Sequence, residues 1–130
     1  MIASIRLDGS TACMAVEGAT DTETFRAYIR DVLGPALRPG DIVVMDNLSA
    51  HKNEQTLELI TSLGAEALFL PAYSPDLNPI EKMWSKVKAL LRTAEARTPD
   101  ELFEAIGRAL ARITPNDARG WFASCGYSFI

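Results

Sequence analysis

Apolar and polar positions along the chain first predict four strands. Two short runs, at residues 2–8 and 11–17, have the composition of β-strands, and Asp8-Gly9 between them is a strong hairpin signal. A continuous apolar run at residues 42–45 and another run at residues 65–70 predict two more strands. Because residues 42–45 are apolar on both sides, we expect that strand in the middle of a sheet with helices on both faces.

Apolar residues at helical spacing predict helices in the stretches between these strands. A helix is predicted from about Asp21 to Leu33, opened by the capping-box pair Thr20 and Glu23. A second helix is predicted over residues 53–63, and Gly64 suits the position just past its end.

The order strand, helix, strand over residues 41–70 predicts a parallel crossover unit. In such a unit both strands end on the same rim of the sheet, so residues 41–46 and 65–70 deliver their last side chains to one edge.

The last third of the chain is predicted to be helical. Asn78 can cap a helix that has Pro79 at its first position, and capping signatures at Thr98 and Thr114 start two more helices. The apolar stripe of the first helix consists of Ile80, Met83, Trp84, Val87, Leu90 and Leu91. The core face of the second consists of Leu102, Phe103, Ile106, Ala109, Leu110 and Ile113.

Length and composition indicate one α/β domain over residues 1–130. No apolar run is long enough for a transmembrane helix, and the N-terminus lacks the pattern of a signal peptide, so we expect a cytoplasmic protein without a membrane partner. Cys13 and Cys125 have no metal-ligand spacing and are predicted to be free thiols. The net charge of −4 argues against a self-sufficient DNA-binding module, but not against an enzyme domain that acts on DNA.

Asp46 directly follows the apolar strand at residues 42–45, where ligands gather in open α/β sheets. Its position is therefore suited to chemistry, although an aspartate there can equally cap a loop or the next helix. An aspartate after an apolar strand is also found in phospho-accepting receiver domains, but the acidic pair that follows their first strand is not visible here. Asp8 is a weaker candidate, because aspartate suits turn geometry.

His51 is the only histidine in the chain and lies five residues beyond Asp46. A single histidine rarely makes a metal site unless carboxylates complete it. It could instead orient a phosphate or bond to its own loop. The sequence favours a place near the site.

Glu81 opens the helix that follows a loop stiffened by three prolines. Ser85, Lys88 and Arg92 share its helical stripe, which suits a helix face that runs along a phosphate backbone. Two simpler interpretations stay open: Glu81 as the third residue of a capping box, and the stripe as a solvated face with ordinary i, i+4 pairing.

Two segments, VMDNLSAHK and LFLPAYSPDLNPIEKMWSKVK, strongly resemble the catalytic domain of transposases of the insertion sequence 630 and mariner type, in the acidic-triad (DDE) superfamily. The match includes the pair Asp46 and Asn47, the SPDLNPIE motif, and the thirty-four residues between Asp46 and Glu81. The resemblance implies a ribonuclease-H-like mixed sheet, built from an N-terminal hairpin and two parallel strands with flanking helices.

The same resemblance implies that Asp46 and Glu81 are the second and third catalytic acids. Both would bind Mg²⁺ or Mn²⁺, two ions in a complete site, for cleavage and transfer of DNA strands. Asn47, His51, Lys52, Ser85, Lys88 and Arg92 are the candidate DNA contacts.

One departure from the family matters: its first acid stands on a central strand before the hairpin, and here the hairpin comes first. We therefore expect an N-terminally truncated catalytic domain, with that strand missing, that performs no strand transfer alone. An upstream transposase segment or a second copy would have to assist it. The alternative is a non-catalytic remnant that acts as an interaction or scaffold protein.

Overall fold

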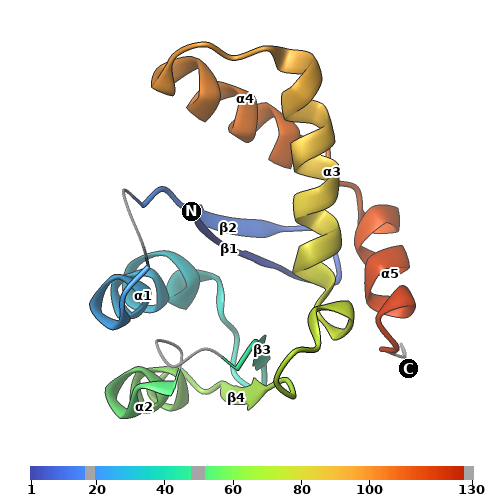
Figure 1. Ribbon diagram of the computed structural model, residues 1–130. Coiled ribbons are helices and arrows are strands. Elements are labelled where there is room, and N and C mark those ends of the chain that lie inside the picture. Colours follow the sequence, from blue (N-terminus) through green and yellow to red (C-terminus); the bar gives the residue numbers. More distant parts are fainter. Residues whose placement is uncertain (17–19, 48–51, 128–130) are drawn as a thin grey trace. The chain divides into compact units, whose positions relative to one another are not determined.

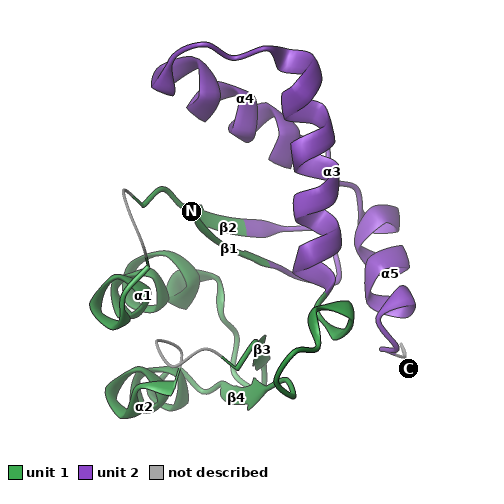
Figure 2. Cartoon of the chain, in the orientation of Figure 1, with its two compact units in different colours: residues 1–4, 12–78 green, residues 5–11, 79–130 purple. Residues whose placement is uncertain are grey.

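The computed structural model describes residues 1–16, 20–47 and 52–127 (Figure 1). The chain splits into two compact units (Figure 2). Unit 1 contains Met1–Ser4 and Ala12–Asn78, and unit 2 contains Ile5–Thr11 and Pro79–Ile130. His51, one of the candidate contacts, lies outside the described residues.

The predicted hairpin is present. Strands β1 (Ile2–Ile5) and β2 (Thr11–Met14) pair with each other, and Gly9 in the turn has φ +90°, which a glycine adopts without strain. A carboxylate oxygen of Asp8 accepts hydrogen bonds from the Ser10 backbone N–H (2.9 Å) and hydroxyl (2.6 Å). These bonds support the turn interpretation of Asp8.

The helix expected from Asp21 to Leu33 is α-helical only in its first half. Helix α1 covers Thr22–Tyr28, and the chain continues as a π-helix, Ile29–Leu33, and a 3₁₀ turn, Gly34–Ala36. The N-terminal cap is Asp21, whose carboxylate accepts from Thr24 N–H at 2.7 Å. Thr20 was therefore the wrong capping residue.

The core of unit 1 forms around α1. Tyr28 is 2% exposed; its hydroxyl donates to the carbonyl of Ala12 (2.8 Å), and burial raises the pKa of this phenol to about 12. The buried members of this core come from α1, the π-helix, the end of β3, α2 and the residue before β4. They are Phe25, Tyr28, Ile29, Leu33, Met45, Ile60 and Ala65.

The predicted crossover unit is confirmed. Strand β3 (Ile42–Met45) pairs in parallel with β4 (Glu66–Phe69), with Ile42 opposite Glu66 and Met45 opposite Phe69. Helix α2 (Glu54–Ser62) connects them. Both strands therefore end on the same rim, as expected from the sequence.

The single mixed sheet is not confirmed. Within the described ranges the strands form two separate two-stranded sheets, β1-β2 and β3-β4. Ile42 is 59% exposed, so β3 is not the fully covered central strand that its apolar sequence predicted. The described residues contain five α-helices and these small sheets, a mixed α/β arrangement compatible with a ribonuclease-H-like fold.

Unit 2 contains the three predicted helices: α3 (Pro79–Ala94), α4 (Pro99–Ala111) and α5 (Pro115–Ser124). On α3, Met83 and Val87 are 0% and 2% exposed, as the apolar stripe requires. Thr98 caps α4, and Thr114 with Asp117 forms a complete capping box on α5.

The predicted core face of α4 is partly wrong. Ala109 and Ile113 of that face are buried, as predicted, whereas Leu102 and Phe103 are 44% and 53% exposed. Ala105, which the prediction did not include, is buried as well. None of the helices in the described part of the chain is long and apolar enough to cross a membrane.

Candidate functional site

Asp46 follows the last residue of β3 and is half-buried. The carbonyl of Met45 accepts from Leu70 N–H at 2.8 Å, so main-chain pairing holds the strand up to the residue before Asp46. The next helix, α2, is capped by Asn53, whose side chain accepts from Gln55 N–H (3.1 Å) and Thr56 N–H (3.3 Å). Asp46 is therefore not the cap of that helix, which removes one of the simpler interpretations.

Two of the other candidate contacts lie close to Asp46 in sequence and are exposed. Asn47 follows it directly. The ammonium nitrogen of Lys52 lies 6.0 Å from the centroid of the Phe69 ring, at the end of β4. This distance allows a weak cation–π contact and leaves the charge in solvent.

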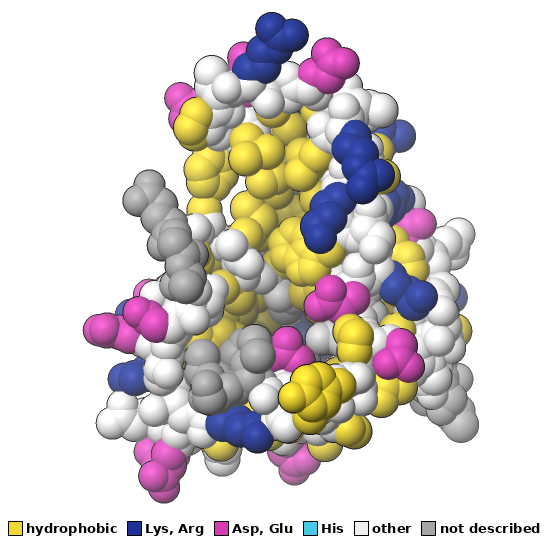
Figure 3. Space-filling view, viewed as in Figure 1, with side chains coloured by type: hydrophobic (Ala, Val, Ile, Leu, Met, Phe, Trp, Pro, Cys, Tyr) yellow, Lys and Arg dark blue, Asp and Glu magenta, His cyan; other side chains and the backbone are white. Residues whose placement is uncertain are grey.

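Glu81 is exposed in the first turn of α3, where the positive end of the helix dipole favours a carboxylate. Its carbonyl accepts from the Ser85 hydroxyl at 3.2 Å. Ser85, Lys88 and Arg92 are exposed, and Figure 3 shows basic side chains along α3. No ion pair joins members of this stripe in the described residues, so the i, i+4 pairing interpretation finds no support in the structure.

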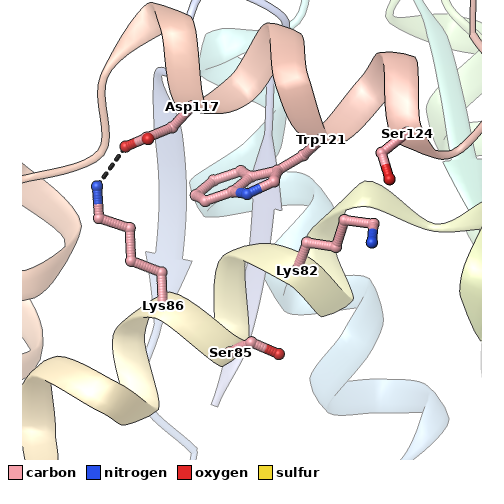
Figure 4. A pocket seen from close by; sticks show the side chains of 6 residues that line it. All are labelled: Lys82, Ser85, Lys86, Asp117, Trp121 and Ser124. Carbon is pink, nitrogen blue, oxygen red and sulfur yellow. Dashed lines mark hydrogen bonds and ion pairs between the residues drawn. The ribbon is translucent and has the colours of Figure 1, made fainter.

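A hollow of about 600 Å³ lies between α3 and α5 (Figure 4). The indole of Trp121 lies over α3, between the side chains of Lys82 and Lys86. The lining residues are Lys82, Ser85, Lys86, Asp117, Trp121 and Ser124. The hollow includes neither Asp46 nor Glu81, so it is not the predicted acidic site.

Lys86 links the helices that surround this hollow. Its ammonium donates to the carbonyl of Arg112 (3.1 Å), at the end of α4, and to the carboxylate of Asp117 in α5. Lys82, one turn earlier, forms no ion pair in the described part of the chain.

The donor chemistry of the two acids suits a hard divalent cation, because carboxylate oxygens are the ligands that Mg²⁺ and Mn²⁺ prefer. Asp46 belongs to unit 1 and Glu81 to unit 2. In the part of the chain that is described, no three His, Cys, Asp or Glu side chains gather into a metal-binding group. Asp46 and Glu81 therefore suit Mg²⁺ or Mn²⁺ by the chemistry of their carboxylate ligands.

Comparison with known proteins gives the family. Residues 1–103 match the model of the DDE superfamily endonuclease family. Over 83 residues the chain is 29% identical to the Transposable element Tcb2 transposase of Caenorhabditis briggsae, a match that covers 64% of this chain and 29% of that protein. The chain thus spans less than a third of the length of this relative. Because the family match covers most of the chain and both candidate acids, the chain belongs to the DDE superfamily endonuclease family.

Proposed function

We propose that this chain is part of the catalytic domain of a DNA transposase, which cuts and joins DNA strands with divalent metal ions. The observation that carries the proposal is the family match over residues 1–103, which includes Asp46 and Glu81. The similarity to a transposase over 83 residues supports the same function.

In this proposal Asp46 and Glu81 hold the divalent metal, Mg²⁺ or Mn²⁺. The bound metal would supply Lewis-acid chemistry at the oxygens that attack and leave phosphorus, and the two carboxylates would hold it. Two positions support this proposal: Asp46 directly follows β3, at the rim that β3 shares with β4, and Glu81 stands in the first turn of α3.

The polar face of α3 would bind the DNA backbone. Ser85, Lys88 and Arg92 are exposed on the stripe that begins with Glu81. Asn47 and Lys52 are exposed near Asp46 and would contact the same DNA. Phosphate contacts of this kind position a duplex without reading its sequence.

We also propose that this chain alone does not transfer strands. An acidic triad has three carboxylates, and this chain offers two at the matching positions. The working assembly would therefore include another transposase segment that supplies the third carboxylate. A non-catalytic interaction role is the second candidate.

Titration calorimetry with Mn²⁺ tests the metal assignment. We expect weak binding to the unchanged chain and an affinity roughly tenfold lower in Asp46→Asn and in Glu81→Gln, since each loses a carboxylate ligand. Asp76→Asn is the matched control, because Asp76 is an exposed acid of the loop before α3. Unchanged affinity in the first two variants, or an equal loss in the control, would contradict the assignment.

A further inference from the structure

Two residues other than glycine have positive φ in the described ranges: Tyr73 (59°) and Glu95 (50°). The left-handed region is unfavourable for side chains with a Cβ, and most of all for bulky ones. Glu95 directly follows the last residue of α3, and helices commonly end in this conformation. Helix termination therefore explains Glu95. Ala72 and Tyr73 form a turn, where Gly or Asn usually takes the position with positive φ, so the tyrosine there needs another explanation.

The ring of Tyr73 makes no packing contact that would compensate for this backbone. Its relative exposure is 101%, whereas Leu70, three residues earlier, is 8% exposed. A tyrosine is an amphipathic aromatic residue that usually buries much of its ring. Here the chain bears an unfavourable backbone conformation and leaves a large ring entirely in solvent.

The loop around Tyr73 is held in place on its C-terminal side. Leu77 N–H donates to the carbonyl of Ser74 (3.1 Å), and Asn78 N–H donates to the carbonyl of Pro75 (3.1 Å). Together with the fixed φ of the proline, these bonds form a 3₁₀ turn, Pro75–Leu77. The ring is thus displayed from a structured turn, and strained residues kept in such settings are concentrated at functional sites.

We propose that Tyr73 is a stacking platform for an unpaired nucleobase of the DNA. This inference rests on the proposed function, which makes DNA the substrate. Aromatic side chains bind single-stranded nucleic acid by stacking on the bases, whatever their identity. The loop from Pro71 to Asn78 contains no lysine or arginine, so its chemistry suits the uncharged face of a base and not a phosphate.

Replacing Tyr73 with glycine should have two opposite effects. It should stabilise the protein, because the backbone strain is relieved, and it should weaken DNA binding, because the ring is lost. In Tyr73→Gly we expect a higher melting temperature, since glycine adopts positive φ without strain. Binding to a fluorescein-labelled hairpin DNA with a single-stranded 3′ thymidine overhang should weaken about tenfold, the loss of one base–aromatic stack. Tyr73→Trp should retain binding.

Glu95→Gly is the matched control: it relieves the same kind of backbone strain and should leave DNA binding undiminished. Tyr73→Asn is a second ring-free variant that tolerates positive φ, and it should bind as weakly as Tyr73→Gly. Equal affinity of the unchanged chain and both ring-free variants would overturn the inference. So would a melting temperature that does not rise in Tyr73→Gly.

All binding is measured in EDTA on DNA that is not cut, so the result is independent of metal binding by Asp46 and Glu81. An overhang with abasic sites should bind the unchanged chain as weakly as the thymidine overhang binds Tyr73→Gly. With the abasic overhang, the variant should show no further loss. Equal binding of both overhangs, or binding of neither, would exclude base stacking at Tyr73. Either result leaves the metal assignment untouched, because calorimetry with Mn²⁺ tests that separately.

Discussion

Two lysines on α3 show how the surroundings of a residue decide its role. Lys86 donates to the end of α4 and to Asp117 in α5, and these bonds connect the three helices of unit 2. Lys88, two positions later, is exposed and has no ion-pair partner in the described residues. From the sequence both are members of one basic helix, and only packing separates the structural cation from the candidate DNA contact.

The contribution of Asp117 to stability is expected to depend on pH. The Lys86 ammonium, followed by the Thr114 backbone N–H, holds the pKa of the Asp117 carboxyl below its ordinary value of 3.8. A depressed carboxyl pKa stabilises the fold above the ordinary value, and this contribution is lost as the pH falls through the lower, folded-state pKa.

We therefore expect Asp117→Asn to be less stable than the unchanged protein by about 1 kcal/mol at pH 7, since it weakens a helix cap. The difference in the free energy of unfolding should shrink as the pH falls below 3.8. Urea unfolding of both proteins between neutral and strongly acidic pH measures it. A difference that stays constant over this range would show that the Lys86–Asp117 pair does not act through charge.

At the scale of elements, local sequence signals predicted where helices begin. The sequence did not predict correctly which side chains the helices bury. Thr98, Thr114 and Pro79 marked helix starts correctly, because capping and proline preferences depend on neighbouring residues alone. Leu102, Phe103 and Ala109 all lie on the predicted apolar face of α4, yet only Ala109 of the three is buried. Periodicity identifies an apolar face but does not say which part of it another helix covers.

The polar face of helix α3 is the proposed contact for the DNA backbone. If its polar face follows a phosphate backbone, Lys88→Gln and Arg92→Gln should each weaken duplex binding at low salt. Each should also reduce the slope of log affinity against log salt by about 1, irrespective of DNA sequence.

Arg119→Gln, an exposed arginine on α5, is the control with the same change of charge. An equal effect in this control would mean that net charge, and not the α3 face, governs binding. Salt-dependent fluorescence anisotropy makes the comparison.

At the scale of the whole molecule, the family and the candidate acids could be predicted from the sequence, and the arrangement of the strands could not. The motif around Glu81 and its spacing from Asp46 are properties of the sequence itself, and the family match confirms the family that they indicated. Whether the hairpin and the parallel pair share one sheet depends on long-range pairing. In the described ranges they form two separate two-stranded sheets, although most of the hairpin and all of the parallel pair belong to unit 1.

Asp46 and Glu81 are the two acids proposed to bind the divalent metal. Fe²⁺ substituted for Mg²⁺, with ascorbate and hydrogen peroxide, generates hydroxyl radicals that cut the backbone next to the bound ion. We predict cuts near residues 46 and 81, suppressed by excess Mg²⁺ and lost at both positions in Asp46→Asn. Cuts elsewhere in the chain, or cuts that persist in Asp46→Asn and Glu81→Gln, would contradict the claim.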